Sequence, residues 1–162
     1  STMISEAATR TQVHAALDTL ENLRKNGRIG AAQSFLGSVL SIKPLIEVRN
    51  GVVEPAGKQR TRSKAMAHLI NLVADNASNI ERISIMHAAC DDIDTFGSQV
   101  QSLVTSKVII GEIGPVVGAH AGLGTIGVVF QTNNYKWFFY PNDIEWIKKL
   151  RTAPLSPGVD LI

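Results

Sequence analysis

The chain has 162 residues, of which 44% are hydrophobic and 19% are charged, and these values predict one globular domain. Its net charge of +2 is too small to predict nucleic-acid binding. No apolar run approaches the roughly 18 residues of a membrane span, and the first residues lack a signal-peptide pattern. The single cysteine, Cys90, excludes an internal disulfide, which is typical of a protein in the reducing cytoplasm.

Short strands and helices alternate in the predicted first part of the chain. An apolar run predicts a strand over 13–17. A helix follows over 19–25 and ends at Asn26-Gly27, because glycine is favoured just after a helix. Apolar residues on one helical face predict a second helix that begins after Gly30 and cannot continue through Pro44.

Asn50-Gly51 is the strongest hairpin signal in the sequence, because a type I′ turn needs positive φ at both central residues. It predicts antiparallel strands over 45–49 and 52–54, with Pro55 ending the second strand. Thr61 is the expected N-cap of a helix. The buried face of that helix is predicted to carry Ala65, Met66, Leu69, Leu72 and Val73.

The next predicted elements are a strand over 83–86, a helix opened by Asp91 and Asp92, and a strand over 108–110. The two carboxylates suit the positive end of the helix dipole. Cys90 is interpreted as a small buried residue near the strand end. Because a hairpin interrupts the alternation, the sequence predicts an α+β fold: a mixed, mostly antiparallel sheet with helices packed on one face.

The stretch from Gly114 to Phe130 contains two apolar runs on either side of a small-residue loop that carries His120. A lone histidine is more often structural, but glycines permit close approach of the backbone to a ligand. We therefore predict that His120 lies at the lip of an apolar pocket and holds the polar head of a ligand. Residues 122–127 match G-x-G-x-x-G, but the β-branched run that follows favours a strand over the helix of a dinucleotide site.

Metal and nucleophile motifs are not found. No histidine pair has the i, i+4 spacing of a helical zinc site, and no nucleophile elbow or Walker loop occurs. We expect neither a metal nor a catalytic residue, and therefore no enzyme. Arg28, Arg60 and Arg62 are either solvated surface charges or groups that recognise an anion or a partner.

Residues 131–162 are rich in aromatic side chains, and we expect a strand over 137–140 and a helix over 143–150. This C-terminal extension is predicted either to pack on the core or to contact a partner, since Trp and Tyr are enriched at interfaces.

The order of several segments resembles the DegV family of fatty-acid-binding proteins over about residues 13–130. Those segments are 20–29, 36–44, Asn50-Gly51, 60–65 and 114–124. Members of the family have two domains with the lipid between them, and this chain resembles the C-terminal domain only. We therefore divide the chain into a DegV-like lipid-binding domain, residues 1–130, and the extension, 131–162.

The resemblance implies that His120, with Ala121 and Gly122, helps to hold an acyl carboxylate. The family loop usually reads His-Thr-Gly-Pro-Gly, and here it lacks the hydroxyl and the proline. Arg28, Arg60 and Arg62 would lie near the pocket mouth or on a docking surface for a fatty acid kinase.

The resulting hypothesis is a non-enzymatic carrier that takes a long-chain fatty acid as its ligand, needs no cofactor, and presents the carboxylate to that kinase. The alternatives are an interaction module that has lost lipid binding, with a second copy of the chain as partner, and a nucleotide-binding enzyme built on the glycine loop.

Overall fold

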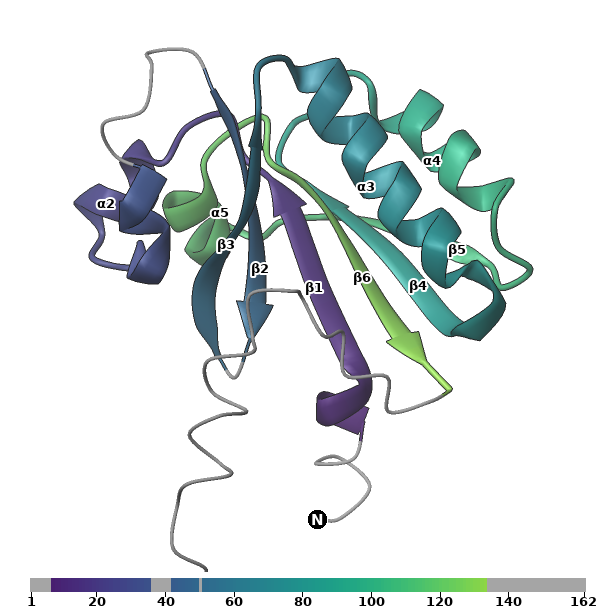
Figure 1. Ribbon diagram of the computed structural model, residues 1–162. Coiled ribbons are helices and arrows are strands. Elements are labelled where there is room, and N and C mark those ends of the chain that lie inside the picture. Colours follow the sequence, from purple (N-terminus) through teal and green to yellow (C-terminus); the bar gives the residue numbers. More distant parts are fainter. Residues whose placement is uncertain (1–6, 36–41, 50, 134–162) are drawn as a thin grey trace, which may run out of the picture.

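A six-stranded sheet organises the computed structural model, which describes residues 7–35, 42–49 and 51–133 (Figure 1). The strands are β1 (Thr11–Ala16), β2 (Lys43–Arg49), β3 (Val52–Gln59), β4 (Ile80–His87), β5 (Val108–Glu112) and β6 (Ile126–Thr132). Their order is β3-β2-β1-β6-β4-β5. Only the β4–β5 pair is parallel, so the predicted mixed, mostly antiparallel sheet is confirmed.

In the residues that the structure describes, four helices and two 3₁₀ segments connect the strands. They are α2 (Glu21–Lys25), η1 (Gly30–Phe35), α3 (Arg62–Asn76), η2 (Ala77–Asn79), α4 (Ile93–Gln101) and α5 (Pro115–Ala121). The predicted cap of α3 is confirmed, since the Thr61 hydroxyl accepts a hydrogen bond from the Lys64 amide at 3.3 Å. The second predicted helix is a short 3₁₀ segment where the structure describes it; the rest of its apolar face, within 36–41, lies outside the described residues.

Helices cover both faces of the sheet, whereas the sequence predicted one covered face. Neighbouring residues on β2 reveal this arrangement, because successive side chains of a strand point to opposite faces. Leu45 belongs to the larger core beneath α3 and α4. Ile46 belongs to a smaller core with Leu20 and Leu23 of the α2 region and Ala32 of η1. In Figure 1, α3 and α4 accordingly lie apart from α2 and α5.

The predicted hairpin is confirmed, with Arg49 opposite Val52 and a φ of +77° at Gly51. Strand β3 nevertheless continues past Pro55, where the sequence predicted its end. Proline is tolerated there because β3 is an edge strand, and the register shifts opposite Leu45 and Ile46. The elements expected over 137–140 and 143–150 lie outside the described residues.

The helices of the described segments are too short or too polar to cross a membrane.

Candidate functional site

The stretch around His120 is a helix rather than the predicted loop. Pro115 occupies the first turn of α5, where its missing N–H is not needed, and Gly114 precedes it with an extended backbone. Gly122 ends the helix with a φ of +86°. The glycines at both ends of this short helix explain why the sequence predicted a small-residue loop. The predicted strand after it is confirmed as β6.

A hollow of about 460 Å³ lies beside α5, within the size range of small-molecule sites. It is formed by the connection after β4, the segment after β5, and α5 itself. Its lining consists of His87, Ala88, Ala89, Glu112, Ile113, Gly114, Pro115, Gly118, Gly122 and Leu123. Most of these side chains are small or apolar, so the hollow offers few polar groups to a ligand.

A larger groove of about 550 Å³ lies between α4 and β5 and is lined by residues such as Gly97, Ser98 and Ile110. None of the predicted site residues lines it. We therefore take the hollow beside α5 as the candidate site.

The three residues of the predicted loop have different surroundings. Gly122 lines the hollow, and Ala121 packs against the smaller core. His120 lies in the last turn of α5, is half-buried and does not line the hollow. Its Nδ1 atom is buried and has no hydrogen-bond partner within residues 7–35, 42–49 and 51–133.

The C-terminal end of helix α5 is held by contacts with the end of α2 and with the residue before β6. The Asn26 side-chain amide donates to the Ala119 carbonyl at 3.0 Å. The Thr125 hydroxyl donates to the Ala121 carbonyl at 2.9 Å. Gly122 has a φ of +86°, which favours glycine, and a β-carbon there would also displace the Asn22 side-chain amide.

An exposed apolar surface adjoins the hollow. Val116 and Leu123 are each 78% exposed, and Val117 is 60% exposed. Leu123 also lines the hollow. Single exposed apolar residues are common, but three within eight positions around a hollow favour contact with a ligand or a partner.

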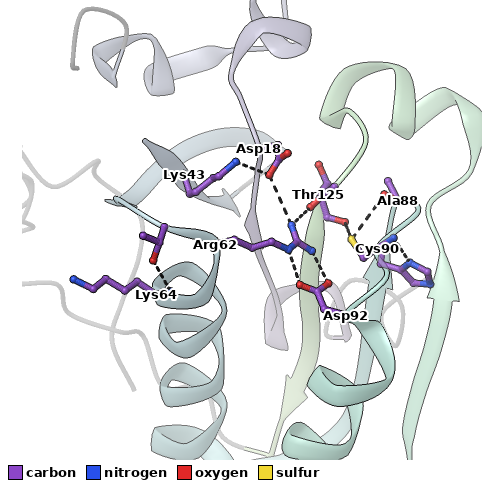
Figure 2. A network of polar contacts seen from close by, with 11 residues as sticks. Asp18, Lys43, Arg62, Lys64, Ala88, Cys90, Asp92 and Thr125 are labelled. Atoms are coloured by element: carbon purple, nitrogen blue, oxygen red, sulfur yellow. Dashed lines mark hydrogen bonds and ion pairs between the residues drawn. The ribbon is translucent and has the colours of Figure 1, made fainter. Parts of the chain in front are cut away.

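Arg62 forms the centre of a polar network with Asp18, Lys43 and Asp92 (Figure 2). It donates from Nε and Nη2 to the Asp92 carboxylate at 2.6 and 2.8 Å, and from Nη1 to the Gly124 carbonyl at 2.6 Å. Asp18 lies 3.8 Å from Nη1 and pairs with Lys43 at 2.8 Å. Hydrogen bonding from Arg62 lowers the pKa of Asp92, and the same bonds raise the pKa of Arg62 above its ordinary value.

The remaining predicted arginines lie away from the hollow's lining. Arg28 is exposed after α2, and Arg60 is exposed directly after β3. Of the six predicted site residues, the structure places only Gly122 in the lining.

The sequence did not identify Asp92 and Asp18 as partners in the Arg62 network. The sequence interpreted Asp92 as a helix-start carboxylate, and it does stand at the N-cap of α4, but its side chain binds Arg62 and makes no cap hydrogen bond. The pairing joins residues 30 positions apart, so no local spacing could have predicted it. Within the described residues, no group of three or more His, Cys, Asp or Glu side chains could hold a metal ion.

Comparison of the sequence with known proteins shows the family to which the chain belongs. The profile described as "Uncharacterised protein, DegV family" matches residues 1–133. A DegV domain-containing protein of Streptomyces coelicolor is 40% identical over 134 residues, which cover 79% of this chain and 47% of that protein. The chain thus spans about half the length of this relative.

Solved structures of similar fold come from the same family. A DegV family protein from Thermus thermophilus, described by its fatty acid binding, matches with a TM-score of 0.71 and 29% identity over 81% of this chain and 49% of that one. DegV from Bacillus subtilis, described as a fatty acid binding protein, matches with a TM-score of 0.64 and 27% identity over 82% and 48%. On the extent of these matches, the chain described here belongs to the DegV family.

Proposed function

We propose that this chain is the C-terminal half of a non-enzymatic fatty-acid carrier and that the hollow beside α5 receives part of a long acyl chain. The observation that carries the proposal is the hollow itself, with a mostly apolar lining that continues onto exposed Leu123. Each buried methylene contributes roughly 0.8 kcal/mol, so an apolar hollow provides affinity without many polar contacts. The fatty-acid binding of the Thermus and Bacillus relatives supports this choice of ligand.

His120 is the residue we propose to orient the carboxylate. A buried ring nitrogen without a partner loses its hydrogen bonds to water, which is unfavourable unless a ligand or another part of the protein provides one. His120 stands two residues before Gly122, which lines the hollow. Gly122 and the Ala121 backbone would let the head group approach this end of α5.

The other half of the protein is expected to cover the exposed side chains of Val116, Val117 and Leu123. In the isolated chain, two copies would share this surface, and light scattering at several concentrations tests for that dimer. Arg28 and Arg60 are exposed and lie outside the hollow's lining. We propose that they contact a fatty acid kinase in the cytoplasm.

Extraction of the purified chain followed by mass spectrometry, together with titration with palmitate, tests the proposed function. We expect bound acyl chains or saturable binding. His120→Ala should weaken palmitate binding about tenfold, the effect of losing one hydrogen bond to a charged group, and should leave hexadecanol binding unchanged. His68→Ala, which alters a half-buried histidine on α3, is the matched control. Absence of any acyl ligand, with or without the other half of the protein, would contradict the proposal.

A further inference from the structure

Arg62 binds two segments that come from different parts of the chain, through Asp92 and through the Gly124 carbonyl (Figure 2). One wall of the hollow is formed by His87, Ala88 and Ala89, and Asp92 follows this wall three residues later. A second part of the wall is formed by Gly122 and Leu123, and Gly124 follows it directly. One guanidinium therefore binds a residue that closely follows each part of the wall, and Arg62 itself does not line the hollow.

We propose that Arg62 is a positioning residue that sets the separation of these two walls and does not contact the ligand. The inference rests on the proposed function for the role of the hollow, but the geometry that it describes exists without a ligand. It differs from the expectation that Arg62 itself recognises an anion.

The geometry requires an arginine. The planar guanidinium gives two hydrogen bonds to Asp92 and a third to the Gly124 carbonyl, in three different directions. A lysine ammonium is a compact charge and would not reproduce the bidentate contact while reaching the carbonyl. The main chain already joins the walls through hydrogen bonds from Gly124 to Ala88 and from Ala88 to Thr125, at 2.8 and 2.9 Å. Arg62 adds the side-chain support on one side of this junction.

Electrostatics argue against an anion at Arg62. Two cations, Arg62 and Lys43, stand beside two carboxylates, Asp18 and Asp92, so their formal charges cancel. A fatty-acid carboxylate approaching this network would meet as many negative as positive groups. Arg62 also already directs Nε, Nη1 and Nη2 at protein oxygens.

The test uses the full 162-residue chain with Arg62→Gln, Asp92→Asn and the double variant, under conditions where circular dichroism shows each to be folded. Lys64→Gln is the control, because it removes an exposed positive charge from the same first turn of α3. Amide hydrogen exchange is measured by NMR without ligand. Dissociation constants are then measured for palmitate and for hexadecanol.

We expect faster amide exchange at residues 87–90 and 122–125 in all three variants and not in the Lys64→Gln control. The dissociation constants for palmitate and for hexadecanol should rise by the same factor, about tenfold. The double variant should bind each probe no more weakly than Arg62→Gln does. Loss confined to palmitate would mean that Arg62 contacts the carboxylate, and unchanged exchange would mean that it does not hold the walls; either result overturns the inference. If the unmodified chain binds neither probe, the proposed function fails, and the exchange measurement still decides the role of Arg62.

Discussion

Both oxygens of the Asp92 carboxylate accept hydrogen bonds from the Arg62 guanidinium, at 2.6 and 2.8 Å, and this pair joins the first turn of α3 to the start of α4. The two side chains are about one third exposed, so water weakens the attraction between their charges. We expect Asp92→Asn to lower the free energy of unfolding by about 1 kcal/mol at pH 7, measured by urea titration.

The same pair predicts a pH dependence. Hydrogen bonding lowers the pKa of Asp92 in the folded state, so its stabilisation is present above the unfolded pKa of about 3.9 and is lost as pH falls through the folded pKa. The stability difference between the unmodified chain and Asp92→Asn should therefore shrink below about pH 4. A constant difference down to pH 2 would show that the ion pair is not its source.

His14 predicts a second loss of stability in mildly acidic solution. The ring is 6% exposed and stacks on Phe130, and burial lowers its pKa from 6.5 to about 4. The positive charges of His68 and Arg49 contribute to this lowering of the pKa, after burial.

Because the unfolded chain binds this proton first, stability should be complete above pH 6.5 and fall as the pH drops to about 4. The expected loss is about 3 kcal/mol, from 1.36 kcal/mol per pKa unit. Urea titrations at several pH values measure it, and NMR follows the His14 ring. His14→Gln should remove most of the slope; an equal slope in that variant would assign it to other groups.

Gly30 and Gly27 form a matched pair for the packing of η1 against β3. Both have positive φ, +52° and +65°, so alanine is strained at either position. At Gly30 a β-carbon would also collide with the Val53 carbonyl oxygen, whereas at Gly27 it would meet open space. We expect Gly27→Ala to cost about 1 kcal/mol and Gly30→Ala about 3 kcal/mol in thermal or urea unfolding. Equal costs would mean that η1 does not pack on β3 as described.

Gly122 and Gly114 form a similar pair at the ends of α5. Gly122 has φ +86° and contacts Asn22, whereas Gly114 has φ −63° and open space around its α-carbon. Gly122→Ala should cost about 2 kcal/mol of stability and weaken palmitate binding, while Gly114→Ala should change the stability little. Asn22→Ala combined with Gly122→Ala should recover part of the loss, because it removes the side chain that the new methyl group meets. No recovery would leave backbone strain as the whole cause.

Local signals in the sequence predicted much of the fold. Thr61 caps α3 and Asn50-Gly51 closes the β2–β3 hairpin, since each depends on residues adjacent in the chain. The apolar run after Gly124 predicted β6 for the same reason. Local propensity failed at Pro55, because whether a strand lies at the edge of a sheet is decided by its distant neighbours.

The sequence by itself determined the main elements, the mixed sheet and the importance of the glycine-rich stretch. Only the tertiary structure decided that this stretch holds a helix, that Gly122 lines a hollow and His120 does not, and that Arg62 is bound by Asp92 and Gly124. The physical reason is the range of the interactions. Caps, turns and periodicity act within a few residues, whereas a hollow and an ion pair between α3 and α4 exist only after the sheet has brought distant segments together.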